Sequence, residues 1–363
     1  MNPGLYVHVP FCLRQCPYCD FFSVSDLTKI PLWLNALDIE VSHQSPYWTY
    51  LFDTVYLGGG SPSLLAPEEL LTLKAIIHRF KISSKAEITL EANPEDVTDD
   101  KTELWASFGV NRLSLGVQSF QEKALTGPLG RSHKPEDIQR AISSVRKSKL
   151  PLSIDLIFAW PGQTLVNWLD ELETAAAAGA EHISAYCLTL APGSPLAESI
   201  KSGLFEAVPE DLAADMFLKT GSFLKKRGFG RYEVSNLAKK GAQCRHNLKY
   251  WHRDNYLGLG PSAHSFDGTR RSSNVSSVDK WAQALANGHT AVNFIEDITF
   301  EQAQTERIML ALRLAEGVPL KWLKDLDKAE FLAKEGYLAN TGAYYKPTEK
   351  GFLASDFLAR SLA

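Results

Sequence analysis

Three cysteines crowd into eight residues near the start of the chain and are the side chains best suited to chemistry. Cys12, Cys16 and Cys19 have the spacing Cys-x3-Cys-x2-Cys, whereas Cys187 and Cys244 stand alone far downstream. An odd number of cysteines in this distribution does not describe a disulfide framework. Three thiolates on one loop can hold a metal centre and leave one of its positions open for a substrate or cofactor, as catalytic sites require.

A structural zinc is the alternative interpretation of this cluster, with His8 or Asp20 as the fourth ligand. Structural zinc sites are closed by four protein ligands. Neither Cys-x3-Cys nor its flanks match the usual zinc spacing. The residues therefore favour a centre with an open position.

The elements that must position this loop alternate along the first half of the chain. Short apolar runs predict strands at 6–9, 54–57, 87–91, 112–116, 153–157 and 182–188, and amphipathic stretches predict helices at 31–41, 67–80, 99–108, 135–147 and 165–178. Such alternation indicates a parallel sheet with helices outside it, either doubly wound or a barrel. Six units predict an α/β fold with a partial (β/α)6 barrel.

Polar or glycine residues stand at the ends of consecutive predicted strands. Gly58–Ser63 follows the second strand, Glu91 ends the third, Gln118 follows the fourth and Asp155 lies near the end of the fifth. The carboxyl ends of parallel strands form the face where barrel active sites lie. Each residue alone is typical of a turn or helix cap, but together they predict a ligand-binding rim.

The alternation ends after about residue 211. A long helix is expected at 211–227, followed by a glycine-rich stretch, then helices at 301–314, 319–326 and 328–335, a hairpin at 337–346 and a last helix at 348–362. These elements predict a small winged-helix-like module, and three domains: a core at 1–230, a connecting segment at 231–298 and the module at 299–363. Residues 301–363 hold nine Lys+Arg and nine Asp+Glu, so we expect no nucleic-acid partner.

Composition limits the class of protein. The 363 residues include 38 Lys+Arg and 42 Asp+Glu, a formal charge of −4, which argues against a general nucleic-acid binder. No apolar run approaches the roughly 18 residues that span a bilayer, and the first residues have neither a basic nor an apolar leader region. We therefore expect a cytoplasmic protein without an integral membrane segment.

The cysteine loop, with Tyr18 before its last cysteine and its place after the first strand, resembles the radical SAM superfamily. The resemblance implies that Cys12, Cys16 and Cys19 hold a 4Fe–4S cluster whose fourth iron chelates S-adenosylmethionine (SAM). The reduced cluster would cleave SAM to methionine and a 5′-deoxyadenosyl radical, and Tyr18 would lie against the adenine.

Within that superfamily nearly the whole chain resembles the coproporphyrinogen-oxidase-like group. The resemblance implies a set of SAM contacts, which are Tyr6, Tyr18, Gly59, Gly60, Ser61, Glu91, Gln118, Arg131 and Asp155. The chain departs from the group at Ala159, where Gly is usual, at Ala191, where Glu is usual, and by one extra residue near Gly127.

Two functions from different classes remain open within this group. One is an oxygen-independent coproporphyrinogen III dehydrogenase, an oxidoreductase that decarboxylates two propionates. The other is a haem chaperone that passes haem to an acceptor protein. Dehydrogenases carry a further Cys where Phe21 stands and a longer extension before the first strand, whereas only five residues precede Tyr6. The chaperone motif His-Asn-x-x-Tyr-Trp is present at 246–251. The resemblance therefore favours the chaperone, with an electron donor as a further partner.

His246 is the expected axial ligand of haem. Haem iron takes His or Cys ligands in an apolar pocket, and Cys244 is the alternative ligand, with Tyr250 and Trp251 as ring surface. The opposing interpretation is that His246 caps a turn while the aromatic residues fill the core. Cys187, in an apolar run, is expected to be a small buried hydrophobe.

Overall fold

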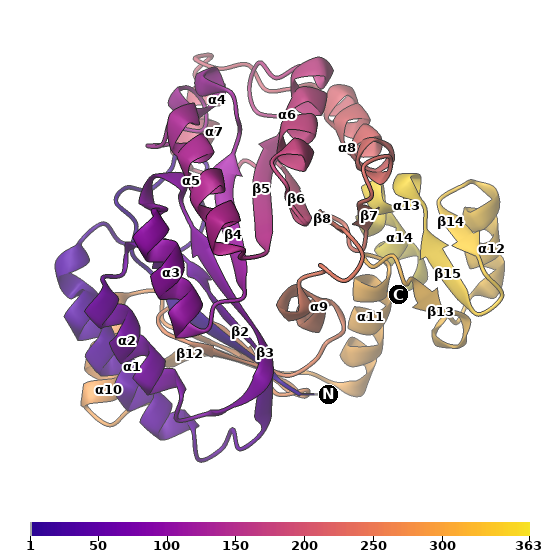
Figure 1. Ribbon diagram of the computed structural model, residues 1–363. Helices are drawn as coiled ribbons and strands as arrows, with labels where there is room; N and C mark the ends of the chain where they lie inside the picture. Colours follow the sequence, from indigo (N-terminus) through magenta and orange to yellow (C-terminus); the bar gives the residue numbers. More distant parts are fainter. Residues whose placement is uncertain (1) are drawn as a thin grey trace. The chain divides into compact units, whose positions relative to one another are not determined.

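Parallel strands alternate with helices through the first part of the chain in the computed structural model, which describes residues 2–363 (Figure 1). The strands are β1 (Gly4–Val9), β2 (Leu51–Gly59), β3 (Lys81–Ala92) and β4 (Arg112–Gln118), and the helices are α1 (Ile30–Gln44), α2 (Pro67–Ile77), α3 (Asp99–Phe108), α4 (Glu122–Thr126) and α5 (Pro135–Ser148). β1, β2, β3 and β4 pair in parallel in that order. The predicted α/β class is confirmed.

The chain divides into two compact units that interleave along the sequence. The first contains Met1–Ser153, Thr189–Ser202 and Asp254–Asp297, and the second contains Ile154–Leu188, Gly203–Arg253 and Ile298–Ala363. The three domains expected from the sequence stay a prediction.

The sheet of the first unit continues beyond β1 through segments of the glycine-rich stretch. Its strand order is β12-β11-β10-β9-β1-β2-β3-β4. The added elements are β9 (Tyr256–Leu259), β10 (His264–Phe266), β11 (Arg270–Asn274), α10 (Val278–Ala286) and β12 (Val292–Asp297), with α7 (Pro195–Lys201) in the same unit. β9 pairs in parallel with β1, and β10, β11 and β12 follow as antiparallel neighbours.

β1 lies in the middle of this sheet, and its sequence shows why. Leu5, Val7 and Val9 are fully buried, as expected for a strand with both neighbours in place and helices against the sheet. Phe11, just beyond the strand, packs its ring edge against Trp33 of α1, with 5.9 Å between the ring centroids. The cysteine loop therefore starts from a rigid, buried support.

The second unit has its own strands and helices. Its strand order is β5-β6-β8-β7. The elements are β5 (Leu152–Phe158), α6 (Leu165–Ala177), β6 (His182–Cys187), α8 (Glu210–Lys225), β7 (Gly230–Arg231), β8 (Asn236–Ala238) and α9 (Arg245–Trp251). β8 pairs antiparallel with both β6 and β7. Trp168 of α6 is fully buried and donates to the hydroxyl of Thr220 on α8 at 2.8 Å, which fixes the two helices together.

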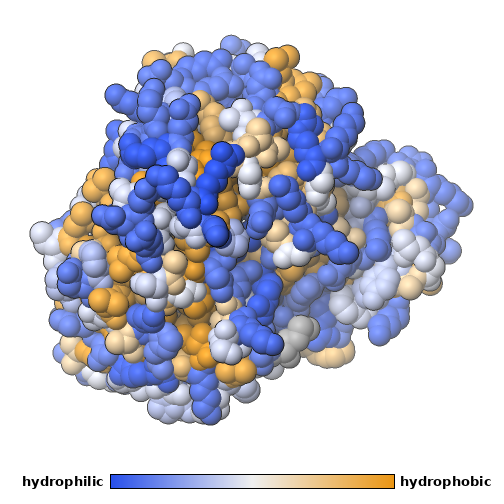
Figure 2. Space-filling view, viewed as in Figure 1, coloured by the Kyte–Doolittle hydropathy of each residue, from blue (hydrophilic) through white to orange (hydrophobic). Residues whose placement is uncertain are grey.

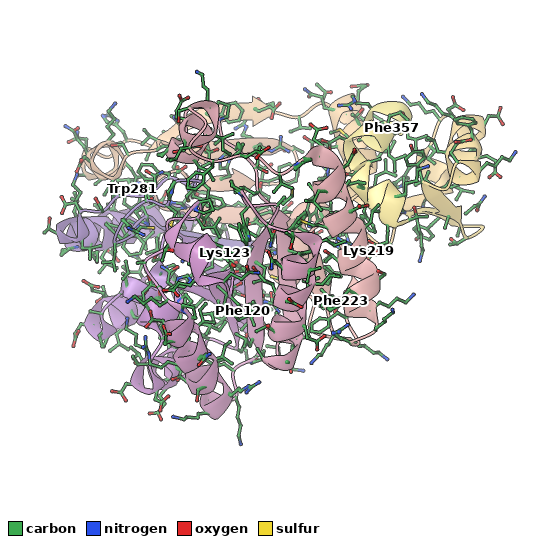
Figure 3. The ribbon with its side chains drawn as sticks, turned by 90° about the horizontal axis from the view of Figure 1, so that it is seen from above. Phe120, Lys123, Lys219, Phe223, Trp281 and Phe357 are labelled. Carbon is green, nitrogen blue, oxygen red and sulfur yellow. The ribbon has the colours of Figure 1, made fainter. Side chains whose placement is uncertain are left out.

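The C-terminal residues of the second unit form the expected small module of helices and a three-stranded sheet. Its elements are α11 (Phe300–Ala311), β13 (Val318–Pro319), α12 (Leu326–Lys334), β14 (Leu338–Asn340), β15 (Tyr344–Pro347), α13 (Glu349–Leu353) and α14 (Ser355–Leu362), and the sheet order is β13-β15-β14. Ile308, Leu332, Tyr345 and Leu358 share its buried core. Phe357 of α14 (labelled in Figure 3) packs against Tyr337, with ring centroids 5.7 Å apart.

Two details of this module differ from the sequence expectation. The helix expected at 319–326 is wrong: Val318 and Pro319 pair with β15, and Leu320–Trp322 form one 3-10 turn. The amide of Leu320 donates to the carbonyl of Ala343, so sheet pairing replaces the first turn of a helix. The last helix is divided in two at Ala354, whose φ of −101° and ψ of 25° depart from helical values.

The surface mixes polar and apolar side chains. Hydrophilic residues cover much of the face in Figure 2, with apolar residues interspersed among them. Among residues 2–363, no helix has the length and apolar character needed to cross a bilayer.

Candidate functional site

The cysteine loop leaves β1 and returns to it, so its two ends are held together. The amide of Cys12 donates to the carbonyl of Val24 at 3.1 Å, and the amide of Val24 donates to the carbonyl of Pro10 at 2.7 Å. Between these points Cys12, Cys16 and Cys19 are each partly buried, and all five cysteines are free thiols. The loop thus presents three thiols at intermediate depth from one pinned base.

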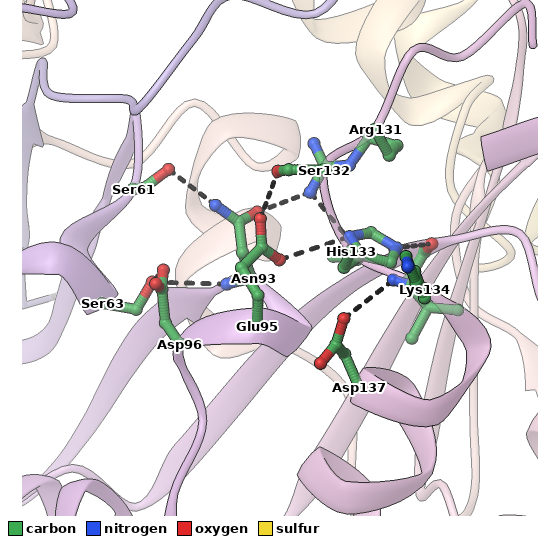
Figure 4. A network of polar contacts seen from close by, with 12 residues as sticks. Ser61, Ser63, Asn93, Glu95, Asp96, Arg131, Ser132, His133, Lys134 and Asp137 are labelled. Atoms are coloured by element: carbon green, nitrogen blue, oxygen red, sulfur yellow. Dashed lines mark hydrogen bonds and ion pairs between the residues drawn. The ribbon is translucent and has the colours of Figure 1, made fainter. Parts of the chain in front are cut away.

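A hydrogen-bonded chain joins two of the thiols by way of the ends of two strands and the side chain of Arg131. Figure 4 shows its middle part, from Ser61 through Asn93 to Arg131. Ser61, after β2, donates to the sulfur of Cys12 at 3.6 Å and accepts from the amide nitrogen of Asn93, after β3, at 2.8 Å. Arg131 donates from one guanidinium nitrogen to Asn93 Oδ1 at 2.6 Å and from the other to the sulfur of Cys16 at 3.4 Å. Hydrogen bonds to cysteine sulfur are among the features that tune iron–sulfur clusters.

The thiols influence one another electrostatically. Burial raises the pKa of Cys12 and of Cys19, and the neighbouring cysteine sulfurs add to the rise in both cases. Among the described residues no group of three His, Cys, Asp or Glu side chains is gathered to hold a single metal ion. A 4Fe–4S cluster takes its thiolates on separate irons and needs a wider arrangement than one ion does.

Glu91 lies at the end of β3 and has hydrogen bonds to both carboxylate oxygens. The hydroxyl of Tyr56 donates at 2.7 Å to one oxygen, and the amide of Gly59 donates at 3.1 Å to the other. Gly59 has φ +106°, and a Cβ added there would lie 2.4 Å from Nδ1 of His8. A Cβ on Gly60 would lie 2.7 Å from the carbonyls of Val9 and Phe11. Close packing against β1 therefore requires both glycines.

His8 connects β1 to the far end of the cysteine loop. Burial lowers its pKa to about 4, so the ring is neutral near pH 7. Nε2 lies 2.9 Å from the carbonyl of Phe22, and Nδ1 lies 3.0 Å from the hydroxyl of Tyr6. Because a carbonyl only accepts, Nε2 carries the proton and Nδ1 accepts from Tyr6.

Tyr6 and Tyr18 are both held as phenols. Burial raises the pKa of Tyr6 well above its usual range, and the charge of Glu91 adds to the rise. Burial likewise raises the pKa of Tyr18, against the opposing charge of Arg131. Each therefore presents a neutral ring and a hydroxyl at any physiological pH.

Asp155 lies on β5 in the second unit and accepts a hydrogen bond from Ser184 of β6 at 2.6 Å. Ala159, one of the departures from the family pattern, follows β5 with φ +61°. Its amide donates to Gln163 Oε1 at 2.6 Å. A left-handed φ suits glycine better than alanine, which is a physical reason for the residue usual in the family.

The His-Asn-x-x-Tyr-Trp motif lies within helix α9, which begins one residue earlier at Arg245. His246 and Cys244 are each only 1% exposed. Nε2 of His246 lies 2.9 Å from the hydroxyl of Tyr250, one helical turn later. Burial, and to a smaller extent the charge of Lys249, lowers the pKa of His246 to about 3. Both candidate haem ligands are thus buried in this conformation, whereas Tyr250 and Trp251 are partly exposed.

Sequence reasoning missed three residues around the thiols and misplaced one cysteine. Asn93 joins Ser61 to Arg131, and Glu95 pairs with His133 at 3.3 Å. For Asn93 and Glu95 the signal was a position within four residues of the end of the predicted strand 87–91, where only Glu91 was singled out; His133 had no such signal. Cys187, expected to be buried, is exposed because it is the last residue of β6, beyond the buried part of the strand.

Comparisons with known proteins agree with these features. Residues 6–175 match the Radical SAM superfamily. The heme chaperone HemW of Mycobacterium tuberculosis is 34% identical over 99% of this chain and 94% of its own. HemW of Bacillus subtilis is 34% identical over 87% of this chain and 84% of its own. Coproporphyrinogen III oxidase (HemN) from Escherichia coli, 22% identical, shares the fold with a TM-score of 0.87 over 99% of this chain and 90% of that structure.

The chain belongs to the radical SAM superfamily and, within it, to the family of the HemW proteins. Membership of the superfamily implies a 4Fe–4S cluster and SAM as cofactors. The residues present fit these groups, because the chain has three partly buried thiols on one loop and a buried guanidinium beside them. Arg131 Nε is buried and has no hydrogen-bond partner among the described residues. An acceptor such as a ligand carboxylate would satisfy it.

Proposed function

We propose that this protein is a haem chaperone that binds a 4Fe–4S cluster, SAM and haem and transfers haem to an acceptor protein. The observation that carries the proposal is 34% identity to a heme chaperone HemW over 99% of the chain. The His-Asn-x-x-Tyr-Trp motif at 246–251 and Phe21 in place of a further cysteine support it. All five cysteines are free, which suits the reducing cytoplasm, our proposed location.

Cys12, Cys16 and Cys19 would hold the cluster, which when bound supplies a low-potential electron to SAM. Arg131 and Ser61 donate to two of the sulfurs. Donors directed at cluster sulfur stabilise its more negative, reduced form. An electron donor, not yet identified, is the further partner this chemistry needs.

SAM would be held by residues of the strands, of their ends and of the loops that follow them, which are Tyr6, Tyr18, Gly59, Gly60, Ser61, Glu91, Gln118, Arg131 and Asp155. Arg131 offers a buried cation for the carboxylate of SAM, and its Nε has no hydrogen-bond partner within residues 2–363. Glu91, fixed by Tyr56 and Gly59, is a rigid acceptor for hydroxyl donors. Tyr18, adjacent to Arg131, offers a neutral ring for stacking on the adenine.

Haem would bind through His246, with Arg245 as an exposed cation for a propionate. His246 is buried and bonded to Tyr250, so ligation requires α9 to open and the Tyr250 hydroxyl to be displaced. A neutral imidazole is the form that binds iron, and the low pKa of His246 keeps it neutral.

The deciding experiment reconstitutes the cluster anaerobically and then measures haem binding by the Soret band in parallel with conversion of coproporphyrinogen III to protoporphyrinogen IX. We expect stoichiometric haem, passed to an apo-haem protein, and no conversion. Catalytic conversion would instead establish a dehydrogenase.

His246→Ala tests the ligand, with the exposed His43→Ala as control for non-specific haem binding. We expect haem affinity to fall at least tenfold in the first variant and to stay unchanged in the second. Unchanged affinity in His246→Ala with a loss in Cys244→Ala would transfer the ligand role to the cysteine.

A further inference from the structure

The end of β4 carries a strained turn at one of the proposed SAM residues. Gln118 has φ +63°, and the amide of Ser119 donates to the carbonyl of Val117 at 2.8 Å, across a single residue. A three-residue turn with a positive central φ is rare and strained. Such a conformation persists only where its surroundings hold it, and it commonly marks a functional position.

His133 supplies a second hydrogen bond to the same carbonyl. Its Nε2 lies 3.0 Å from the oxygen of Val117, and its side chain is fully buried. On the other side of the ring, Nδ1 lies 3.3 Å from Oε2 of Glu95. Both ring nitrogens therefore face an acceptor oxygen, and the buried ring lies between the carbonyl of Val117 and the carboxylate of Glu95.

Glu95 is itself fixed. It follows β3 in the turn Pro94–Asp96, and the hydroxyl of Ser132 donates to its Oε1. Although burial favours its neutral form, the hydrogen bonds from His133 and Ser132 hold its pKa at about 2. Glu95 is therefore an anion at physiological pH, and it contacts two consecutive residues that follow Arg131, Ser132 and His133.

The segment 131–133, shown beside Glu95 in Figure 4, binds the end of β4 at two successive carbonyls. Arg131 donates to the carbonyl of Gly116 at 3.4 Å, and His133 binds the carbonyl of Val117. The side-chain nitrogen of Gln118, Nε2, lies against Gly116: a Cβ added to Gly116 would be 3.0 Å from it. The orientation of Gln118 and that of Arg131 thus depend on the same two residues, Glu95 and His133, which we call the clamp.

We infer that Glu95 and His133 are a positioning pair for SAM: they hold the strained turn that presents Gln118 and fix the segment that carries the Arg131 guanidinium. This inference rests on the proposed function, since it takes Gln118 and Arg131 as contacts of SAM. Neither residue of the pair touches a cysteine sulfur in the contacts described, so we expect the cluster to be retained when the pair is broken.

The test compares His133→Phe with His182→Phe. His182 is an equally buried histidine of β6 that bonds to Tyr232 at 2.9 Å, so it matches the loss of packing and of a hydrogen bond elsewhere. The first measurement is hydrogen–deuterium exchange of the peptide covering 117–121 in protein without cluster or SAM. The second is the dissociation constant for SAM in reconstituted protein, with iron and sulfide content measured alongside.

For His133→Phe we expect exchange at 117–121 to be about tenfold faster and SAM binding to be about tenfold weaker, as follows from the loss of one buried hydrogen bond. Iron and sulfide content should equal that of the wild type. His133→Gln keeps a donor for Val117 and should restore SAM affinity to within about threefold, which also covers the case that the Phe variant does not fold.

Three results would overturn the inference. They are wild-type exchange and SAM affinity in His133→Phe, the same changes in His182→Phe, and no loss of affinity when Glu95→Ala removes the carboxylate that faces His133. If wild-type protein binds no SAM, the proposed function loses that cofactor. The exchange measurement still decides whether His133 holds the turn.

Discussion

The cysteine loop and helix α9 differ in how ready their side chains are to bind a ligand. Cys12, Cys16 and Cys19 are partly exposed on a loop whose ends are pinned to β1. Cys244 and His246 are 1% exposed. The first region is built in advance for its cofactor, whereas the second must change conformation before it can bind one.

The polar contacts of the two regions show the same contrast. Around the cysteine loop, donors point at sulfur, and Arg131 keeps a buried Nε without a partner among the described residues. In α9 the Nε2 of His246 already has the Tyr250 hydroxyl at 2.9 Å. A ligand of the first region completes a set of hydrogen bonds, and a ligand of the second must replace one.

The largest effect is expected from Cys16→Ser. Loss of one of three thiolate ligands should remove essentially all cluster iron, because hydroxyl is a far poorer ligand for iron–sulfur clusters than thiolate. Iron and sulfide analysis after anaerobic reconstitution measures it. The exposed Cys187→Ser is the matched control and should keep its cluster. Haem stoichiometry should be equal in both variants, and a loss of haem in Cys16→Ser alone would break the separation of the two regions.

Gly59→Ala should come next in size. A Cβ there would lie 2.4 Å from Nδ1 of His8, at φ +106°, so we expect a destabilisation of about 3 kcal/mol from strain and overpacking. Gly288→Ala is the control, because it has φ +74° and nothing within 4 Å of the added Cβ, and should cost about 1 kcal/mol. Urea unfolding measures the free energy of unfolding of both variants. An equal loss in the two would show that the His8 side chain can move away from the added Cβ without destabilising the protein.

The predicted alternation matches β1 to β6 and the helices α1, α2, α3, α5 and α6, because apolar residues recur at a regular spacing in each. The first half of β3, which is polar and largely exposed, and the short helix α4 were not predicted. The strands β9 to β12 escaped prediction. β11 reads Arg-Arg-Ser-Ser-Asn, which has no apolar alternation, and β10 has three residues. What places β9 in the sheet is parallel pairing with β1, some 250 residues away in sequence, and such pairing leaves no local signal.

The residues of the site also divide into those with a local sequence signal and those without one. Cysteine spacing and the strand-end positions of Glu91 and Gln118 were readable, because both depend on residue type and local order. The clamp of Glu95 on His133 joins residues 38 positions apart, and a single buried histidine in a sequence looks the same whether it pairs with a carboxylate or not. The burial of His246 depends on tertiary packing, which a motif of six residues does not encode.

A smaller effect is expected from weakening the attachment of α9. Arg253, just after the helix, bonds to Glu306 of α11 at 2.7 Å, with side chains 6% and 24% exposed. If α9 must open for haem, Glu306→Gln should raise the haem association rate about tenfold, because a charge-assisted bond becomes a neutral one. Stopped-flow absorbance measures it. Asp297→Asn breaks an exposed pair with Arg270 and should change nothing; an equal rate in Glu306→Gln would show that haem enters without this opening.

The smallest effect is an expected constancy of haem affinity with pH. Burial lowers the pKa of His246 to about 3, so between pH 5 and 8 the free protein carries this imidazole neutral. Opening of α9 would restore an ordinary pKa, but only in a minor population, and linkage depends on the protons bound by the free protein as a whole and by the complex. Neither state binds a proton at this imidazole, so the affinity for haem should vary less than about twofold over that range.

If the ligand were a histidine with an unperturbed pKa near 6.5, the affinity for haem would instead fall about thirtyfold between pH 8 and pH 5. Soret titrations of wild type and His246→Ala at four pH values distinguish the two, and a thirtyfold loss in the wild type would mean that the iron is held by a histidine on the open surface.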